Sequence, residues 1–578
     1  MRGALFAPKQ SPIRGVGIAS LPAVARNDTA CEKGRFGLKW EFIAEAKRIL
    51  EREQGTIYKD WGGKLPIALA YPNTYQVGMS NLGLQTVYRL FNQRADVVCE
   101  RVFYKPGSRP LISLESQRAG KDFAVLAFSI SFEMDYFNVV EMLRQADIPP
   151  LAEERDGGYP LLLAGGPAVT ANPQPLAPIF DAFAIGEAEV IVPPLVETLQ
   201  AGIGGSRDEL LSSLACIPGI YVPTQYLISS TQYPVKRQWA PNLDTHPTTS
   251  VVLTLDTEFG DMYLIEIARG CGRGCRFCLA GYTYRPVRER SPAVLLEQAK
   301  EGLRYRDKIG LVSAAVSDYS RLEELVAGSQ EMGTRLSVSS LRVDPLPEVL
   351  VRALAESGAQ TLTIAPEAGS QRLRTLINKN VSEDDLMRAA DLAARYDFAQ
   401  LKLYFMLGLP TETDEDVQAL IDLALAVQGR FPRRITVNIT PFVPKAHTPF
   451  QWVAMTPVER LKKGLTRIEQ ALRPRGIAVR AESPAWAAVQ GVLSRGDRRI
   501  GQALVRVKRR SLAAWRRALR ECQLDAAEYL RERSWDEPLP WSVVDSGVRR
   551  DYLWREMGRA LNFKPQNSNF KAQGEKVG

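Results

Sequence analysis

Short apolar segments alternate with amphipathic stretches along most of the chain. In the first part, four such segments are bounded by turn residues, at 66–71, 123–128, 160–164 and 180–185. Amphipathic stretches such as 84–91 and 136–143 lie between most of them. Strands that are apolar on both faces and alternate with helices are typical of a parallel sheet covered on both sides. The pattern predicts an α/β fold that begins with a Rossmann-like parallel sheet.

A second alternation of strands and helices follows a turn-rich stretch at 216–257. Six βα units over about 180 residues predict a partial parallel barrel or a doubly wound sheet. The strands are expected at 262–268, 310–315, 336–341, 361–365, 399–406 and 434–440. Beyond residue 457 the sequence becomes helical and basic. The predicted division is a tail at 1–38, a first domain at 39–215, a connector at 216–257, a core at 258–455, a basic mostly helical region at 456–564 and a tail at 565–578.

Composition restricts where such a chain works. Four of its seven cysteines are widely scattered, so a secreted disulfide framework is not expected. No uncharged apolar run reaches the roughly 18 residues of a membrane span. Residues 1–26 are basic without a continuous apolar core, which favours an unstructured extension over a transit peptide. We therefore expect a cytoplasmic protein in a reducing compartment, with no membrane partner.

The other three cysteines lie within eight residues, in the spacing Cys-x3-Cys-x2-Cys. Cys271, Cys275 and Cys278 follow the first strand of the second alternation, between glycines and arginines. Thiolates suit zinc or an iron–sulfur cluster. Zinc would need a fourth cysteine or histidine, whereas three ligands on four irons leave one iron open for a substrate. The alternative, three buried thiols in a loop, does not explain the glycines and arginines.

This motif, with Phe277 before the last cysteine, resembles the radical S-adenosylmethionine (radical SAM) superfamily over about residues 259–452. The resemblance implies a partial (β/α)6 barrel, a 4Fe-4S cluster held by the three cysteines, and SAM bound to the open iron. Reductive cleavage of SAM would give a 5′-deoxyadenosyl radical. An electron donor such as flavodoxin or ferredoxin is implied as a partner.

Further segments extend the resemblance to the SAM site. Residues 312–319 take the place of the glycine-rich turn that contacts the SAM amino group, which implies Ser313 and Ser317 as contacts. Glu367 ends the fourth strand, where relatives carry a polar residue that reaches the SAM ribose. Lys379 matches a basic position that pairs with the SAM carboxylate. The alternatives are a helix N-terminal charge for Glu367 and a solvated surface lysine.

Residues 60–200 resemble the cobalamin-binding, Rossmann-like domain that precedes many radical SAM cores. Clusters of small and polar residues at the strand ends carry this resemblance and imply the cofactor contacts Ser129, Ser131, Gly165, Gly166, Gly186 and Glu187. The Asp-x-His-x-x-Gly motif is absent, so a bound cobalamin is expected to lack a histidine ligand. The lower side of the corrin would be lined by Tyr71, Asn73, Tyr75, Gln76 and Met79. The alternative is an α/β domain that binds no corrin.

Residues 495–520 carry ten Lys or Arg and one acidic residue, Asp497, with Trp515 among them. Such a segment could bind RNA or another anionic partner. The alternative is a solvated helix whose apolar face (Leu504, Val507, Leu512, Trp515) packs on the barrel.

The function predicted from the sequence is a radical SAM enzyme, most simply a cobalamin-dependent methyltransferase that acts on an unactivated carbon. Segments 340–344, 378–380 and 442–450 resemble a group of bacterial radical SAM proteins with a fused cobalamin-type domain, relatives of the radical methylthiotransferases. The alternatives are a radical SAM rearrangement or a methylthiolation without cobalamin, and a noncatalytic RNA- or ribosome-associated factor. The substrate is unknown from the sequence.

Overall fold

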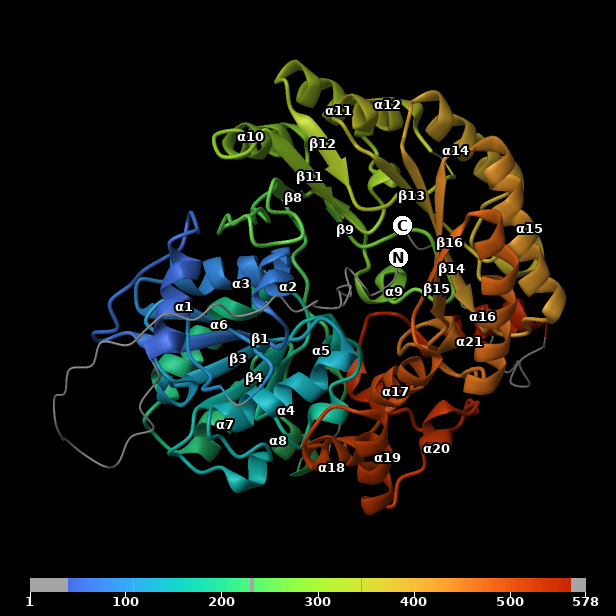
Figure 1. Cartoon of the computed structure of the whole chain (residues 1–578). Coiled ribbons are helices and arrows are strands. Elements are labelled where there is room, and N and C mark those ends of the chain that lie inside the picture. The colour runs from blue at the N-terminus through green and yellow to red at the C-terminus, as the bar shows by residue number, and fades with distance from the viewer. Residues whose placement is uncertain (1–39, 108, 229–232, 345, 563–578) are drawn as a thin grey trace, which may run out of the picture.

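The computed structural model describes residues 40–562 except 108, 229–232 and 345 (Figure 1). The predicted tails at 1–38 and 565–578 lie outside these residues. Within them, a first α/β domain lies beside a curved second α/β unit, and the last helices lie along the lower side of both. The expected α/β architecture, with parallel sheets in both parts, is confirmed.

The first domain is built on a six-stranded sheet with the order β2-β1-β3-β4-β5-β6. Its neighbours pair in parallel up to β5, and β6 is antiparallel to β5. The edge strand β6 comes from the segment predicted as a connector, so the sheet extends beyond residue 215. The strands are β1 (Leu65–Tyr71), β2 (Val97–Phe103), β3 (Val125–Ser129), β4 (Leu161–Gly165), β5 (Ala182–Ala184) and β6 (Ile220–Tyr221).

The two faces of this sheet are covered by different parts of the chain. On one face, Ile67 and Leu69 join a cluster with α3, α6 and α7; on the other, Ala68 and Ala70 join one that includes α4. The helices are α1 (Trp40–Leu50), α2 (Tyr75–Met79), α3 (Leu82–Gln93), α4 (Tyr136–Gln145), α5 (Pro167–Ala171), α6 (Ala188–Gly202), α7 (Arg207–Ala215) and α8 (Pro223–Ile228). The strand order reverses between β1 and β3, and a sheet of this kind binds ligands at the carboxyl edge of that point.

The second unit consists of two parallel sheets that continue each other. One has the order β12-β11-β8 and the other β13-β14-β15-β16, and a bridge between Leu341 and Ile364 joins them. The strands are β8 (Tyr263–Glu266), β11 (Lys308–Val312), β12 (Arg335–Val338), β13 (Thr361–Glu367), β14 (Gln400–Leu407), β15 (Arg434–Pro441) and β16 (Ala478–Ala481). Because β16 pairs with β15, the sheet reaches beyond the predicted boundary at 455.

Helices line the outer side of these strands (Figure 1). They are α10 (Pro292–Gly302), α11 (Leu322–Glu331), α12 (Glu348–Glu356), α14 (Glu383–Arg395), α15 (Asp414–Arg430) and α16 (Val458–Leu472). Their apolar faces and the strands form one continuous core. The carboxyl ends of the parallel strands therefore remain available for a site on the inner side.

The C-terminal helices close the molecule rather than forming a separate body. They are α17 (Pro484–Arg495), α18 (Arg499–Arg506), α19 (Leu512–Glu521), α20 (Ala526–Leu530) and α21 (Arg550–Leu561). Leu504, Val507 and Trp515 are buried in the same cluster as the β-strands and α4 of the first domain. The expectation that this apolar face packs on the barrel is therefore wrong. None of the helices in the described residues is long and apolar enough to cross a membrane.

Candidate active site at the cysteine loop

The cysteine loop runs from β9 (Ala268–Arg269) to α9 (Ala280–Thr283) at the carboxyl edge of the second unit. Gly270 opens it with φ +90°, and a Cβ there would lie 2.5 Å from the Tyr284 carbonyl oxygen, so only glycine fits. Cys275 and Cys278 are buried, whereas Cys271 is partly exposed. The Cys278 amide donates to the Cys275 carbonyl at 3.1 Å, so these two cysteines lie at the two ends of one backbone turn.

The surroundings of Cys271 change the pKa of its thiol. Burial raises the pKa of Cys271, and the nearby Cys278 and Cys275 raise it further. In the described residues, no three His, Cys, Asp or Glu side chains lie close enough to hold a single metal ion. An iron–sulfur cluster makes a different demand, because each thiolate binds its own iron. The donor set of three adjacent thiols fits a cluster better than one ion.

Contacts with later segments hold the loop from one side. The Gly274 carbonyl accepts hydrogen bonds from Asn378 Nδ2 at 2.9 Å and from the Tyr282 hydroxyl at 3.1 Å. Arg276 donates to the Leu376 carbonyl at 2.8 Å and pairs with Glu556 of α21 at 3.2 Å. Residues nearly 300 positions apart therefore fix the backbone between the cysteines.

A buried ion-pair network holds the start of the loop from the other side. Arg269 pairs with Glu187 and Glu189 of the first domain, each at 2.8 Å, and with Glu266 at 2.8 Å. Glu187 also accepts hydrogen bonds from Arg288, from Nη2 at 2.7 Å and from Nη1 at 2.9 Å. Burial opposes its charge, but these arginines hold the pKa of Glu187 below its ordinary value. The structure thus places Glu187 between the two domains, not at an open cofactor edge as predicted.

A second arginine, in the segment that follows β12, lies close to one of the cysteines. Arg342 Nη1 lies 3.8 Å from Cys275 Sγ, and its Nη2 donates to Asp344 at 2.9 Å. Burial disfavours its charge, but Cys275 and Asp344 hold the pKa of Arg342 above its ordinary value. Arg342 is not among the site residues predicted from the sequence. Its cation suits the negative charge of thiolates and cluster.

The predicted SAM contacts lie around this loop. Ser317 is buried, and its hydroxyl accepts the Arg342 amide at 3.3 Å. The next residue, Asp318, accepts two hydrogen bonds from Arg273 of the loop, both at 2.9 Å. Ser313 follows β11 and is only partly buried, and Phe277 packs in the apolar cluster that holds Cys275. The segment after β11 is therefore adjacent to the cysteines, as the resemblance implies.

Glu367 and Lys379 form a buried pair. Lys379 Nζ lies 3.6 Å from Glu367 Oε1, and both residues are 2% exposed. Glu367 has φ +68° at an irregularity in the pairing of β13 with β14, a conformation that costs about 1–3 kcal/mol and often marks functional sites. Burial excludes the alternative of a solvated surface lysine. The ribose and carboxylate roles stay predictions.

The predicted cofactor contacts of the first domain follow β3, β4 and β5. Ser129 and Gly165 are paired neighbours at the carboxyl ends of β3 and β4. Gly165 has room for a side chain, because an added Cβ would meet only Ala184 at 3.6 Å. At Gly166 and Gly186 an added Cβ would lie 2.6 Å and 2.2 Å from backbone carbonyl oxygens, so the backbone itself requires glycine there.

The residues after β1 differ from the predicted lining of a corrin. Asn73 stays at the carboxyl edge, where it donates to buried Asp135 at 2.8 Å, and Ser131 accepts from Asn81 at 3.3 Å. Burial raises the pKa of Asp135 to about 7. Met79 is buried in the core beneath the sheet, so its predicted place below a corrin is wrong.

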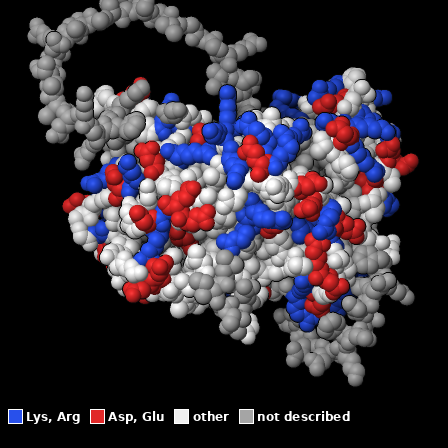
Figure 2. All heavy atoms as spheres, turned by 90° about the horizontal axis from the view of Figure 1, so that it is seen from below, with Lys and Arg blue, Asp and Glu red and all other residues white. Residues whose placement is uncertain are grey.

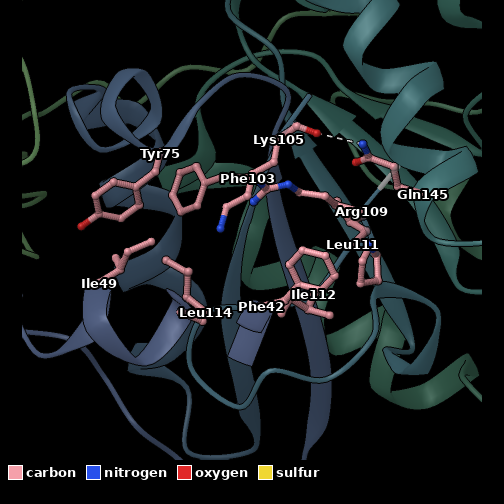
Figure 3. Close-up of a pocket in the computed structure, with 12 residues that line it drawn as sticks. Phe42, Ile49, Tyr75, Phe103, Lys105, Arg109, Leu111, Ile112, Leu114 and Gln145 are labelled. Atoms are coloured by element: carbon pink, nitrogen blue, oxygen red, sulfur yellow. Dashed lines mark hydrogen bonds between the residues drawn. The ribbon is translucent and has the colours of Figure 1, made fainter. Parts of the chain in front are cut away.

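Tyr75 points into an apolar pocket beneath α1 instead (Figure 3). Its hydroxyl donates to Glu53 at 2.6 Å, and its ring contacts Phe103. Lys105 and Arg109 at this pocket both pair with Glu45 of α1. These ion pairs border the pocket, and none of the residues that line it belongs to the cysteine loop.

Comparison with known proteins agrees with this geometry. Residues 83–223 match the family described as radical SAM proteins, N-terminal, and residues 265–424 match the radical SAM superfamily. An uncharacterized protein of Methanocaldococcus jannaschii is 33% identical over 446 residues, which cover 76% of this chain and 90% of that protein. The chain belongs to the radical SAM superfamily. A 4Fe-4S cluster and SAM are the cofactors of this superfamily. That Cys271, Cys275 and Cys278 hold the cluster stays a prediction.

More distant relatives share part of the chain. A tRNA-2-methylthio-N(6)-dimethylallyladenosine synthase of Pseudothermotoga lettingae is 27% identical over 197 residues, 32% of this chain and 44% of that protein. Among solved structures, the radical SAM methyltransferase TsrM of Kitasatospora setae with cobalamin and a [4Fe-4S] cluster has a TM-score of 0.48 at 12% identity, over 80% of this chain and 99% of that one. The cobalamin-dependent radical enzyme OxsB has a TM-score of 0.46 at 15% identity, over 62% of this chain and 52% of that one.

Proposed function

We propose that this radical SAM enzyme is a cobalamin-dependent methyltransferase that acts on an unactivated carbon. The observation that carries the proposal is the orientation of the first sheet. Its strand order reverses between β1 and β3, and the carboxyl edge there contacts the second unit, where Lys445 pairs with Glu133 at 2.5 Å. A ligand at the reversal point would therefore lie between the first domain and the cysteine loop.

The residues at this edge fit a large flat cofactor. Ser129 and Gly165 sit side by side at the strand ends, and Gly165 leaves room that a side chain would fill. The chain has only two histidines, His246 and His447. The ring of His447 is buried against the Ala171 carbonyl at 3.1 Å, so it is engaged within the fold. We expect a cobalamin bound without a histidine ligand.

The chemistry is divided between the two parts. When bound, the cluster supplies the electron that cleaves SAM, and cobalamin supplies the methyl group, which a second SAM renews. A reduced flavodoxin or ferredoxin is the proposed source of the electron. The chain itself fixes the cysteine loop through Arg269 and Arg276, compensates its charge through Arg342, and positions SAM through Glu367 and Lys379.

Methylthiolation is a weaker candidate. A methylthio-transferring synthase is among the relatives, but the match covers only 32% of this chain. Methylthiolation also needs an auxiliary cluster with its own cysteines. Outside the loop the sequence has Cys31, Cys99, Cys216 and Cys522, too scattered to form a second group of three. A radical rearrangement without cobalamin is the stronger alternative.

Anaerobic reconstitution followed by three measurements tests the proposal: bound iron, bound corrin, and the products formed from SAM. We expect about four irons per chain, retained corrin, and both 5′-deoxyadenosine and S-adenosylhomocysteine. Formation of 5′-deoxyadenosine by protein that retains no corrin, despite ample cobalamin, would favour the rearrangement. Absence of both nucleosides would contradict the assignment as a radical SAM methyltransferase.

A glycine substitution tests the corrin site separately. Gly165→Leu should expel corrin, because the side chain fills the space at the strand end, whereas Gly157→Leu is a matched control in a loop with no neighbour within 4 Å. Electron paramagnetic resonance of the Co(II) form should show no nitrogen splitting from an axial base. Equal corrin retention in both variants would show that the corrin does not bind at this edge.

A further inference from the structure

Residues 499–520 form a strongly cationic surface, which we call the basic face. Eight side chains on α18, α19 and the loop between them are exposed or nearly so. In the described part of the chain only two of them form ion pairs, Arg499 with Asp497 at 2.7 Å and Arg517 with Glu521 at 3.6 Å. The members are Arg499, Arg506, Lys508, Arg509, Arg510, Arg516, Arg517 and Arg520.

The direction of these cations is fixed by the buried side of the same helices. Trp515 packs edge-on against Phe137 of α4, with ring centroids 5.5 Å apart. Arg144 of α4 donates to the Val507 carbonyl at 2.9 Å. The helices are therefore anchored on the first domain, and their charged sides point outward. Figure 2 shows the underside of the molecule, where blue basic side chains gather near the middle with red acidic ones among and around them.

Unpaired like charges at this spacing repel one another and cost stability. A partner that brings negative charge would relieve that cost. The large exposed apolar side chains of the described residues are Trp40, Tyr58, Tyr233, Leu255, Val287 and Tyr305, none of them in the basic face. Protein interfaces normally have an apolar centre, whereas phosphates need only Lys and Arg. Trp515 is buried, so it cannot stack on a base.

We propose that the basic face binds the phosphate backbone of a nucleic acid without reading its bases. The face also lies close to the proposed reaction site. The Arg510 guanidinium sits over the rings of Trp486 at 5.2 Å and Phe137 at 5.8 Å, and Phe137 follows Asp135 at the carboxyl end of β3. A bound nucleic acid, or a molecule attached to one, would therefore lie beside the edge where the first domain meets the second unit.

Fluorescence anisotropy with the full-length protein tests this proposal. The probes are an RNA hairpin and a DNA duplex of equal length, each titrated over a series of salt concentrations. The test variant replaces four exposed cations of the basic face with glutamine. The control variant replaces four exposed cations of α16 and its C-terminal cap with glutamine. The test positions are Lys508, Arg509, Arg516 and Arg520; the control positions are Lys462, Lys463, Arg467 and Arg473.

At about 0.1 M salt the test variant should bind at least about tenfold more weakly, and the slope of log affinity against log salt should fall by about 3 units. The control should stay within about twofold of the wild type. Tighter binding of the hairpin would identify RNA, through its 2′-hydroxyls or its shape, as the natural source of the phosphates. SAM cleavage should be equal in all three proteins, because no residue of the cysteine loop or SAM site is changed.

Three results would overturn the proposal. The first is an equal loss of binding in both variants, which would show that net charge, and not the basic face, determines binding. The second is no binding of either nucleic acid by the wild type. The third is displacement of the probes by poly-glutamate at equal charge concentration, which would point to an acidic protein. None of these results depends on whether SAM cleavage or cobalamin binding is found.

Discussion

Replacing Arg342 with glutamine should make the cluster harder to reduce. Arg342 Nη1 lies 3.8 Å from Cys275 Sγ, its side chain is 10% exposed, and Asp344 keeps it in place. Reduction adds one negative charge to the cluster, and a nearby cation stabilises that charge. Removing the cation therefore lowers the reduction potential.

The size of the effect follows from Coulomb's law. A guanidinium about 6 Å from the centre of the added charge interacts with it by about 3 kcal/mol at an effective dielectric constant of about 20. For a one-electron couple, about 1.4 kcal/mol corresponds to about 59 mV. Allowing for screening by solvent, we expect the potential to fall by roughly 60–120 mV.

A redox titration monitored by electron paramagnetic resonance measures this shift in the reconstituted protein. Arg335→Gln is the matched control, since Arg335 begins β12, only seven positions before Arg342 in the chain, but is half-exposed and pairs with Asp307. The control should keep the wild-type potential. An Arg342→Gln potential within about 20 mV of the wild type, or an equal shift in both variants, would refute the electrostatic role.

Three further predictions follow from single residues. Cys275→Ala should remove the roughly 400 nm cluster absorbance and stop SAM cleavage without unfolding the chain, whereas Cys216→Ala should do neither; SAM cleavage at the wild-type rate in Cys275→Ala would contradict the cluster assignment. Glu367→Ala should weaken SAM binding by roughly 1–3 kcal/mol in equilibrium dialysis, and an unchanged affinity would make Glu367 structural. Burial lowers the pKa of His447 to about 4, so the unfolded chain binds the extra proton and stability falls as the pH drops from about 6.5 towards 4. Between about pH 7.5 and 4.5 this amounts to about 2–3 kcal/mol in urea unfolding, and His447→Asn should lose that part of the pH dependence; an unchanged profile would show that His447 is not its source.

Apolar alternation predicted the strands that are apolar on both faces. β1, β3, β4 and β5 lie where the apolar segments indicate, and β8 and β11 to β15 overlap the ranges expected in the second unit. Of the strands in the parallel sheets, β6, β16 and β2 were not predicted, and β2 contains Glu100 and Arg101. Both are buried, and Arg101 pairs with Glu53 at 2.6 Å and Glu115 at 2.7 Å. Local sequence shows charged residues there, and only the folded chain shows their partners.

The cysteine loop could be recognised as a candidate cluster site because its three thiols lie within eight residues. Ser317 and Lys379 were predicted as SAM contacts from the radical SAM resemblance, and those roles stay predictions. Arg342 and Glu187 show the limit of such reasoning. Cys275 lies 67 positions from Arg342, and the arginines that pair with Glu187 lie 50 to 101 positions from it. Neither spacing carries a local signal. Arg342 therefore had no predicted role, and Glu187 was predicted to contact a cofactor rather than arginines.

These long-range pairs explain how the two parts of the molecule work as one. Arg269 ties the start of the cysteine loop to Glu187 and Glu189 of the first domain, and Arg276 ties its middle to Glu556 of the last helix. A buried charge that loses its partner is strongly destabilising. Without the first domain Arg269 would keep only Glu266 of its three carboxylates, and without α21 Arg276 would lose Glu556. The contacts that hold the cysteine loop therefore come from both ends of the described chain, so a fragment limited to the radical SAM core would lack part of them.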